Sequence, residues 1–218
     1  MTIDILRQVT LFSTLEDHDL QALAALARPI TVQRGEIIIS QGSVGDALYV
    51  VISGRVRVYV SDKDGKEMVL TLEGPSAVFG EIAVLDGAVR SASIAAMEKT
   101  ELLKIGADDF FALLERNAEL NRSVIQSLAG RIRKLTHGAQ GLALDSVYRR
   151  LTARLQECAV EENSEWVITE RLTHQLLADM IGCSREMVSR IMSDLVKGGY
   201  IRIEPGRWVI ERKLPADY

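Results

Sequence analysis

The chain has 218 residues, of which 47% are hydrophobic and 26% charged, and its formal net charge is −4 at pH 7. This balance excludes a disordered chain, and no apolar run reaches the ~18 residues that a membrane span needs. The N-terminus lacks the basic start and apolar core of a secretory signal, and the two cysteines, Cys158 and Cys183, are too few for a disulfide framework, so we expect a cytoplasmic protein of one or two globular domains.

The first half of the chain predicts a short helix followed by a β-structure. Apolar residues have helical spacing from residue 13 to 27, and their period changes to two between residues 30 and 103. The clearest strands are Glu36–Ile39, Leu48–Ile52, Val56–Val60, Met68–Leu70 and Ala92–Ala95. Glycines stand at most corners, and the segment 62–65 has the composition of a hairpin tip. Short strands at this spacing predict an antiparallel barrel or jelly roll.

A helical period returns after Asp108 and persists as far as Leu142. Its apolar positions alternate at intervals of three and four residues and are Ile125, Leu128, Ile132, Leu135, Ala139 and Leu142. A helix that packs on its own domain is one interpretation. The strict alternation is narrower than a core-facing stripe and favours a seam between two chains, so we expect a homodimer. A hinge near residues 141–145, a helix over 147–158 and an acidic loop over 161–165 follow.

The segment from residue 172 to 198 has the pattern of a helix-turn-helix. Thr173 can cap a first helix and Ser184 a second, and Gly182 between them can supply the positive φ of the turn. Ala178 is small where the two helices must approach closely. These features predict a helix-turn-helix, and a hairpin over 201–210 would make the domain winged.

The start of the second helix carries side chains that can read DNA. Arg185 and Arg190 can pair bidentately with guanine, and Glu186 can accept from cytosine N4. The residues assigned to the DNA interface are Thr173, Ser184, Arg185, Glu186, Ser189 and Arg190. A solvated helix face with salt bridges would look the same on an arbitrary helix, but the helix-turn-helix frame favours DNA. Arg202 and Lys213 are candidates for phosphate contacts.

Six short motifs, in their order along nearly the whole chain, resemble the CRP/FNR family of bacterial transcription regulators. They are Gln41-Gly42, Ser53-Gly54, Gly65-Lys66-Glu67-Met68, Phe79-Gly80-Glu81-Ile82, Arg90-Ser91 and Gly182-Cys183-Ser184-Arg185-Glu186. The resemblance implies an α+β fold. A cyclic-nucleotide-binding β-roll, or jelly roll, would span 1–107, a dimerisation helix and hinge 108–144, and a C-terminal winged helix-turn-helix 145–218.

The segment 80–91 resembles the phosphate cassette of this family. Arg90 can fork onto a cyclic phosphate, Ser91 can add a hydroxyl, and Glu81 can accept from a ribose 2′-OH. The resemblance implies these ligand-binding residues: Gly80, Glu81, Ile82, Ala83, Arg90, Ser91, Arg131 and Thr136. An ordinary ion pair between Glu81 and Arg90 is the alternative without a ligand. Where the family's best-known member has two purine-contacting hydroxyls, this chain has Leu135-Thr136, which leaves the base open.

The sequence therefore predicts a ligand-responsive, sequence-specific DNA-binding regulator controlled by a cyclic nucleotide such as cAMP. One alternative is the same regulator with another ligand, such as a cyclic dinucleotide, or with none. Another is a cyclic-nucleotide module without DNA binding, which the winged segment disfavours. The expected partners are a second copy of the chain, RNA polymerase and double-stranded DNA, at a palindrome with TGTGA-like half-sites; no membrane is expected.

An enzyme is not expected, because the sequence has no nucleophile–base pair, metal cluster or phosphate loop. Neither metal nor heme is expected as a cofactor. No cysteine precedes Cys158, and the three histidines, His18, His137 and His174, are scattered and interpreted as solvated or structural.

Overall fold

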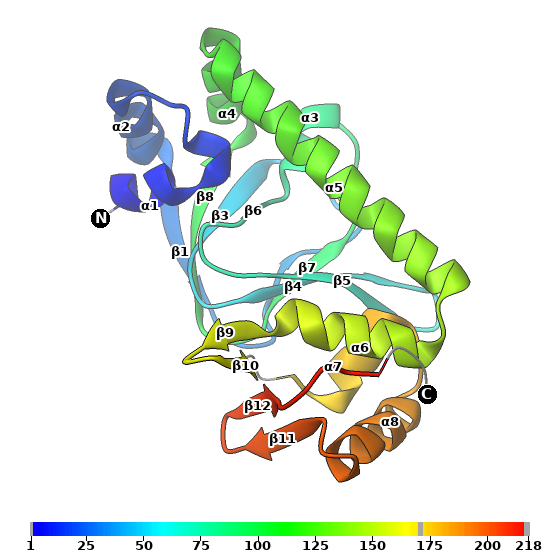
Figure 1. Ribbon diagram of the computed structural model, residues 1–218. Helices are drawn as coiled ribbons and strands as arrows, with labels where there is room; N and C mark the ends of the chain where they lie inside the picture. Colours follow the sequence, from blue (N-terminus) through cyan, green and yellow to red (C-terminus); the bar gives the residue numbers. More distant parts are fainter. Residues whose placement is uncertain (1, 170–171, 216–218) are drawn as a thin grey trace. The chain divides into compact units, whose positions relative to one another are not determined.

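The structure is a computed structural model that describes residues 2–169 and 172–215 (Figure 1). The chain divides into two compact units, and the division falls between Arg133 and Lys134, within the long helix α5 (Ala118–Leu144). The first unit is a β-roll with flanking helices and the second is a winged helix-turn-helix, which confirms the predicted α+β fold class. Among the described residues, none of the helices combines the length and the apolar character that crossing a bilayer requires.

Eight strands of the described chain form the β-roll as two four-stranded antiparallel sheets, β1-β8-β3-β6 and β2-β7-β4-β5. The bounds are β1 (Arg28–Val32), β2 (Ile37–Ile39), β3 (Ala47–Ser53), β4 (Val56–Ser61), β5 (Glu67–Glu73), β6 (Val78–Phe79), β7 (Ser93–Ala96) and β8 (Thr100–Gly106). The hairpin tip expected at residues 62–65 joins β4 to β5, and Gly65 has the positive φ of 79° that this turn needs.

Strand β3 is buried on both faces, so it belongs to two cores. Tyr49 and Val51 pack with Phe79 and with residues of the second sheet, and the Tyr49 and Phe79 rings stack at a centroid distance of 5.3 Å. Leu48 and Val50 point to the opposite face, because side chains alternate along a strand. There they pack under the helices α1 (Thr2–Gln8), α2 (Asp17–Leu26), α4 (Ala107–Arg116) and the first part of α5.

In the second unit, a helix and two strands precede the two helices of the helix-turn-helix, and two further strands follow them. Helix α6 (Val147–Cys158) precedes β9 (Val160–Glu162) and β10 (Glu165–Ile168), and the pair itself is α7 (His174–Ile181) and α8 (Arg185–Lys197). The wing is β11 (Ile201–Glu204) and β12 (Arg207–Ile210), and its sheet has the order β11-β12-β10-β9.

The local chemistry predicted for the helix-turn-helix is confirmed. The Thr173 hydroxyl accepts the Leu176 N–H at 3.0 Å, and the Ser184 hydroxyl accepts the Met187 N–H at 3.3 Å. Gly182 ends α7 in the left-handed conformation at φ 66°. Ala178 is fully buried, as the close approach of two helices requires.

Two predictions about local structure were wrong. The acidic segment 161–165 is not a loop but part of the hairpin β9–β10, which turns at Asn163 and Ser164, both at positive φ (52° and 67°). Two consecutive positive φ values are typical of a type I′ turn, whose twist matches that of paired strands. The helix expected from residue 13 begins only at Asp17, because Ser13 ends the 3₁₀ turn of residues 10–12 and donates to the Thr10 carbonyl, and Glu16 is extended at the N-cap.

Candidate functional site

Arg90 is a buried cation in the segment between α3 (Glu81–Asp86) and β7. Its side chain is 4% exposed. Nη1 donates to the carbonyl oxygen of Gly80 at 2.6 Å, and Nη2 donates to that of Ala47 at 2.7 Å. These bonds fix the guanidinium against the N-terminal end of α3 but do not balance its charge.

The acidic group beside Arg90 is Asp46, and it is shared. Its carboxylate lies 3.4 Å from Nη2 of Arg90 and 3.0 Å from the Lys104 ammonium, and its side chain is 65% exposed. The hydrogen bond from Lys104 is the main cause that lowers the pKa of Asp46, and the charge of Arg90 contributes less. Asp46 is therefore chiefly the partner of Lys104, which leaves the buried charge of Arg90 weakly compensated and suited to an anion.

Gly80 provides the space for this arrangement. Its φ is 82°, and a Cβ atom at this position would lie 2.8 Å from Nη1 of Arg90 and 3.0 Å from Cδ1 of Ile39. Any larger residue would be strained and would displace the guanidinium. Gly80 and Arg90, which the sequence assigned to the same ligand site, are therefore in direct steric contact.

Glu81 is a buried acidic residue at the start of α3. Its side chain is 6% exposed, and neither carboxylate oxygen has a hydrogen-bond donor among the described residues. Nη1 of Arg131 lies 2.9 Å from Oε1, close enough for an ion pair but without hydrogen-bond alignment. Burial raises the pKa of the Glu81 carboxyl, and the charge of Arg131 opposes that shift. A hydroxyl donor would satisfy this acceptor.

Arg131 connects the cassette to α5. Besides its ion pair with Glu81, it donates from Nη2 to the Val78 carbonyl at 2.6 Å. The structure thus brings four predicted residues together in two contacts, Gly80 with Arg90 and Glu81 with Arg131. The ion pair considered between Glu81 and Arg90 is replaced by these two contacts.

The remaining predicted ligand residues differ in exposure. Ala83 is buried, Ile82 is half-buried and Ser91 is exposed next to Arg90. Thr136 is an exposed residue of α5 that belongs to the second unit. No group of three or more histidine, cysteine, aspartate or glutamate side chains with metal-binding geometry occurs in the part of the chain that the structure describes.

A second candidate surface lies at the start of α8. Arg185, Glu186 and Arg190 are exposed there, and Nη2 of Arg190 lies 3.0 Å from the sulfur of Met187. Hydrogen bonds from its own backbone N–H and from Ser184 lower the pKa of Glu186, so its carboxylate is an acceptor only. These groups present two planar donors and one acceptor on neighbouring turns, the complement expected for base edges.

Ser189 makes a side-chain contact that the sequence did not predict. It is half-buried, and its hydroxyl is 2.9 Å from Nδ1 of His174 on α7. The sequence assigned Ser189 to the DNA interface and treated His174 as a solvated or structural residue. No short-range pattern could indicate the contact, because it joins residues on two different helices.

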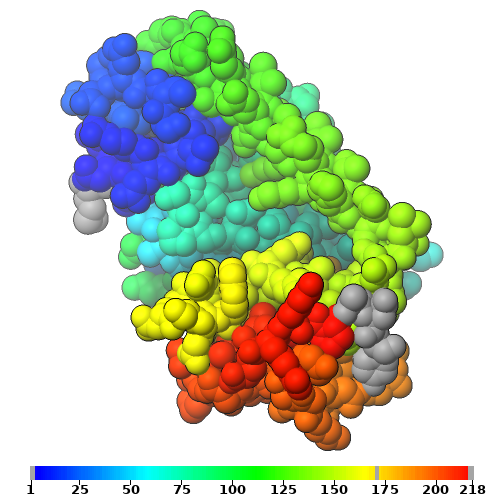
Figure 2. Space-filling view, viewed as in Figure 1, coloured from blue at the N-terminus to red at the C-terminus, as the bar shows by residue number. Residues whose placement is uncertain are grey.

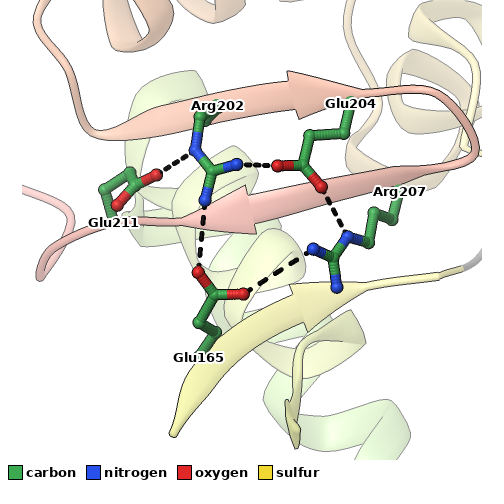
Figure 3. A network of polar contacts seen from close by, with 5 residues as sticks. All are labelled: Glu165, Arg202, Glu204, Arg207 and Glu211. Atoms are coloured by element: carbon green, nitrogen blue, oxygen red, sulfur yellow. Dashed lines mark hydrogen bonds and ion pairs between the residues drawn. The ribbon is translucent and has the colours of Figure 1, made fainter. Parts of the chain in front are cut away.

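The wing carries a network of ion pairs that the sequence analysis did not predict (Figure 3). Arg202 contacts the carboxylates of Glu165, Glu204 and Glu211, and Arg207 bridges Glu204 and Glu165. Because three carboxylates surround Arg202, a phosphate contact from this residue would require these pairs to break. Lys213 is exposed.

Comparisons with known proteins agree with this geometry. Residues 29–117 match the model of the cyclic nucleotide-binding domain, and residues 149–214 match that of the Crp-like helix-turn-helix domain. The chain is 35% identical over 191 residues to the cyclic AMP receptor protein of Thermus thermophilus, covering 88% of this chain and 86% of that protein. It is 28% identical over 205 residues to the CRP-like cAMP-activated global transcriptional regulator of Mycobacterium tuberculosis, covering 92% of each.

Solved structures show the same relationship. The catabolite activator protein of Thermus thermophilus is 31% identical and matches with a TM-score of 0.57 over 93% of each chain. The c-di-GMP-responsive regulator CLP of Xanthomonas campestris matches with a TM-score of 0.77 over 91% of this chain and 100% of that chain. At 22% identity, the likeness to CLP is one of fold.

The buried carboxylate of Glu81 leads to a prediction about the stability of the fold. Because burial raises the pKa of Glu81 in the folded state, its contribution to stability is present below the unfolded-state pKa of about 4.3 and is lost as the pH rises through the folded-state pKa. Glu81→Gln should therefore increase the free energy of unfolding at pH 7 by about 0.5–2 kcal/mol, with a difference that shrinks toward pH 4. Urea unfolding from pH 4 to 8 measures this.

Glu101→Gln is the matched control, since Glu101 is an exposed residue of β8 and should change the free energy of unfolding by less than about 0.5 kcal/mol. A Glu81→Gln protein that is less stable than the wild type at pH 7 would show that the ion pair with Arg131 outweighs the burial of the carboxylate.

Proposed function

Since the chain belongs to the CRP/FNR family of bacterial transcription regulators, we propose that its β-roll binds a cyclic mononucleotide, cAMP in the first place, and that this ligand controls DNA binding by the winged helix-turn-helix. The observation that carries the proposal is Glu81, a buried carboxylate to which no described residue donates a hydrogen bond, close to the weakly compensated cation Arg90. A cyclic nucleotide carries both complements, because its phosphate is an anion and its ribose 2′-OH is a donor.

The proposed roles follow the predicted residues. Arg90 and Ser91 bind the phosphate, and Glu81 accepts from the ribose hydroxyl. The remaining proposed ligand-binding residues are Gly80, Ile82, Ala83, Arg131 and Thr136. The similarity to the cyclic AMP receptor protein of Thermus thermophilus and to the cAMP-activated regulator of Mycobacterium tuberculosis supports cAMP as the ligand. A regulator that senses another ligand, or none, is the alternative. We propose no catalytic activity, because the relatives are transcription regulators.

We also propose a homodimer through α5. Three apolar residues of the predicted seam are strongly exposed: Ile125 (66%), Ile132 (64%) and Leu135 (59%). Leu128 differs, because it is half-buried and packs against the core of the β-roll. A second copy of α5 would cover the exposed row by the symmetric contact that a two-fold dimer requires.

For DNA, we propose that the start of α8 enters the major groove, with Arg185 and Arg190 on guanines and Glu186 on a cytosine. Thr173, Ser184 and Ser189 complete the proposed interface. The two-fold dimer then reads a palindrome with TGTGA-like half-sites about one helical turn apart. We propose that the protein acts in the cytoplasm. RNA polymerase is a further proposed partner. The proposed domains are 1–107 for ligand sensing, 108–144 for dimerisation and 145–218 for DNA binding.

Calorimetry against a panel of cyclic nucleotides tests the ligand. The wild type should bind one cyclic mononucleotide best, and Arg90→Gln should weaken that binding by about 30-fold or more, because a buried phosphate loses its charge partner. Glutamine can still donate to one of the two carbonyls that Arg90 holds, so the cassette should keep its fold. Arg116→Gln, on the exposed side of α4, is the control and should bind like the wild type. An absence of heat with every cyclic mononucleotide at millimolar concentration would favour the alternative ligand.

Sedimentation equilibrium tests the dimer. Leu135→Glu should weaken dimerisation on the order of a hundredfold, because each subunit loses a buried leucine and two like charges meet across the two-fold axis. Gln126→Glu places the same charge on an exposed position of α5 outside the apolar row and should leave the dimer intact. A wild-type protein that is monomeric at tens of micromolar would contradict the proposal.

A further inference from the structure

His174 and Ser189 connect the two helices of the helix-turn-helix through their side chains. His174 is the first residue of α7, Ser189 lies in the second turn of α8, and Nδ1 is 2.9 Å from Oγ. The wing holds the same imidazole from another direction. The Trp208 ring of β12 meets it edge-on, with a centroid distance of 6.4 Å and an interplanar angle of 65°. The imidazole is therefore restrained from α8 and from the wing.

We propose that His174 is a positioning residue for DNA recognition, which holds the Ser189 hydroxyl and thereby determines the kind of base edge that this hydroxyl can meet. The inference rests on the proposed function, because it requires the start of α8 to lie in the major groove. In this role His174 helps to determine specificity, although it contacts no base itself.

The hydrogen-bonding capacity of the two groups explains how the restraint acts. A serine hydroxyl has one donor hydrogen and two acceptor lone pairs, and Nδ1 of a neutral imidazole is either a donor or an acceptor. If Ser189 donates to Nδ1, its hydroxyl can only accept, for example from cytosine N4 or adenine N6. If Nδ1 carries the hydrogen, the Ser189 hydrogen remains available for guanine O6 or thymine O4. In either case the imidazole occupies one hydrogen-bonding site of the hydroxyl and fixes its direction.

The position of Ser189 on α8 makes this choice relevant to DNA. At 3.6 residues per turn, Ser189 projects between the directions of Arg185 and Glu186, which are both exposed. Without His174, the hydroxyl would rotate and could donate or accept. The expected result is a loss of preference at one base position, with little loss of affinity for the best site.

Selection from random DNA with the full chain and its cyclic nucleotide tests the inference. The variants are His174→Leu, which cannot hydrogen-bond, His174→Asn, whose amide can replace Nδ1, and Ser189→Ala. We expect His174→Leu to reduce the preference at one half-site position by roughly two- to tenfold, the contribution of one hydrogen bond, and to leave the other positions unchanged. His174→Asn should retain the preference.

Two further proteins, Ser189→Ala alone and Ser189→Ala combined with His174→Leu, show whether His174 acts through the hydroxyl. Ser189→Ala should flatten the same position as His174→Leu, and the two changes together should flatten it no further. Because alanine is smaller at a half-buried site, this variant also reports on the role of the hydroxyl if His174→Leu is unstable. An unchanged preference in both single variants, or a uniform loss over all sequences, would overturn the inference.

Arg190→Ala separates this inference from the proposed function. Under the proposed function, it should relax the preference at a different position, by about 5- to 150-fold. If it does so while His174→Leu changes nothing, only the role of His174 is wrong. A wild-type protein that selects no palindrome would overturn the proposed function together with this inference.

Discussion

The carboxylate of Glu81 is buried at the start of α3, with Arg131 at 2.9 Å and with no hydrogen-bond donor from the described residues on either oxygen. A buried acceptor in this state lowers the stability of the unliganded fold, and such local losses are typical of functional sites. The same side chain has a second effect, because it holds Arg131 of α5 beside the cassette. Helix α5 continues without a break from Ala118 to Leu144 and carries the exposed apolar row. In the proposed function, a ligand that satisfies Glu81 therefore acts on the helix through which two chains associate.

The sequence predicted those parts of the fold that depend on local chemistry. The caps Thr173 and Ser184 and the left-handed Gly182 were found because each needs only its neighbours in the chain. The hairpin β9–β10 was missed because its strand residues include several exposed glutamates, which give no apolar alternation, and because Asn163 and Ser164 were treated as part of an acidic loop. Leu128 matched the heptad spacing of the seam but packs on the β-roll, since spacing alone does not tell which side of a helix meets its own domain.

For the candidate sites too, the sequence predicted some residues but not the contacts that depend on tertiary packing. The resemblance to a known family indicated Gly80, Glu81, Arg90 and Arg131, and the structure joins them in pairs. The resemblance could not indicate that Asp46 would be shared between Arg90 and Lys104, because this sharing depends on how β3 and β8 pair. In the second unit, the register of β10, β11 and β12 places Glu165, Arg202 and Glu211 on one face of the sheet, as Figure 3 shows. Figure 2 shows the segment that contains β11 and β12, which supply three of the five residues labelled in Figure 3, at the surface that faces the viewer. The charge of Arg202 is therefore balanced by its neighbours, although the sequence made Arg202 a candidate for a phosphate contact.

The most direct test of the account is whether the cyclic nucleotide and DNA affect each other's binding. The affinity for the selected palindrome should be measured by fluorescence anisotropy with and without saturating cAMP, at one fixed salt concentration because phosphate contacts depend on salt. The account predicts that cAMP tightens DNA binding by roughly five- to 150-fold and that DNA tightens cAMP binding by the same factor, since coupling between two sites is reciprocal. Tight binding of cAMP that leaves the DNA affinity unchanged would contradict it.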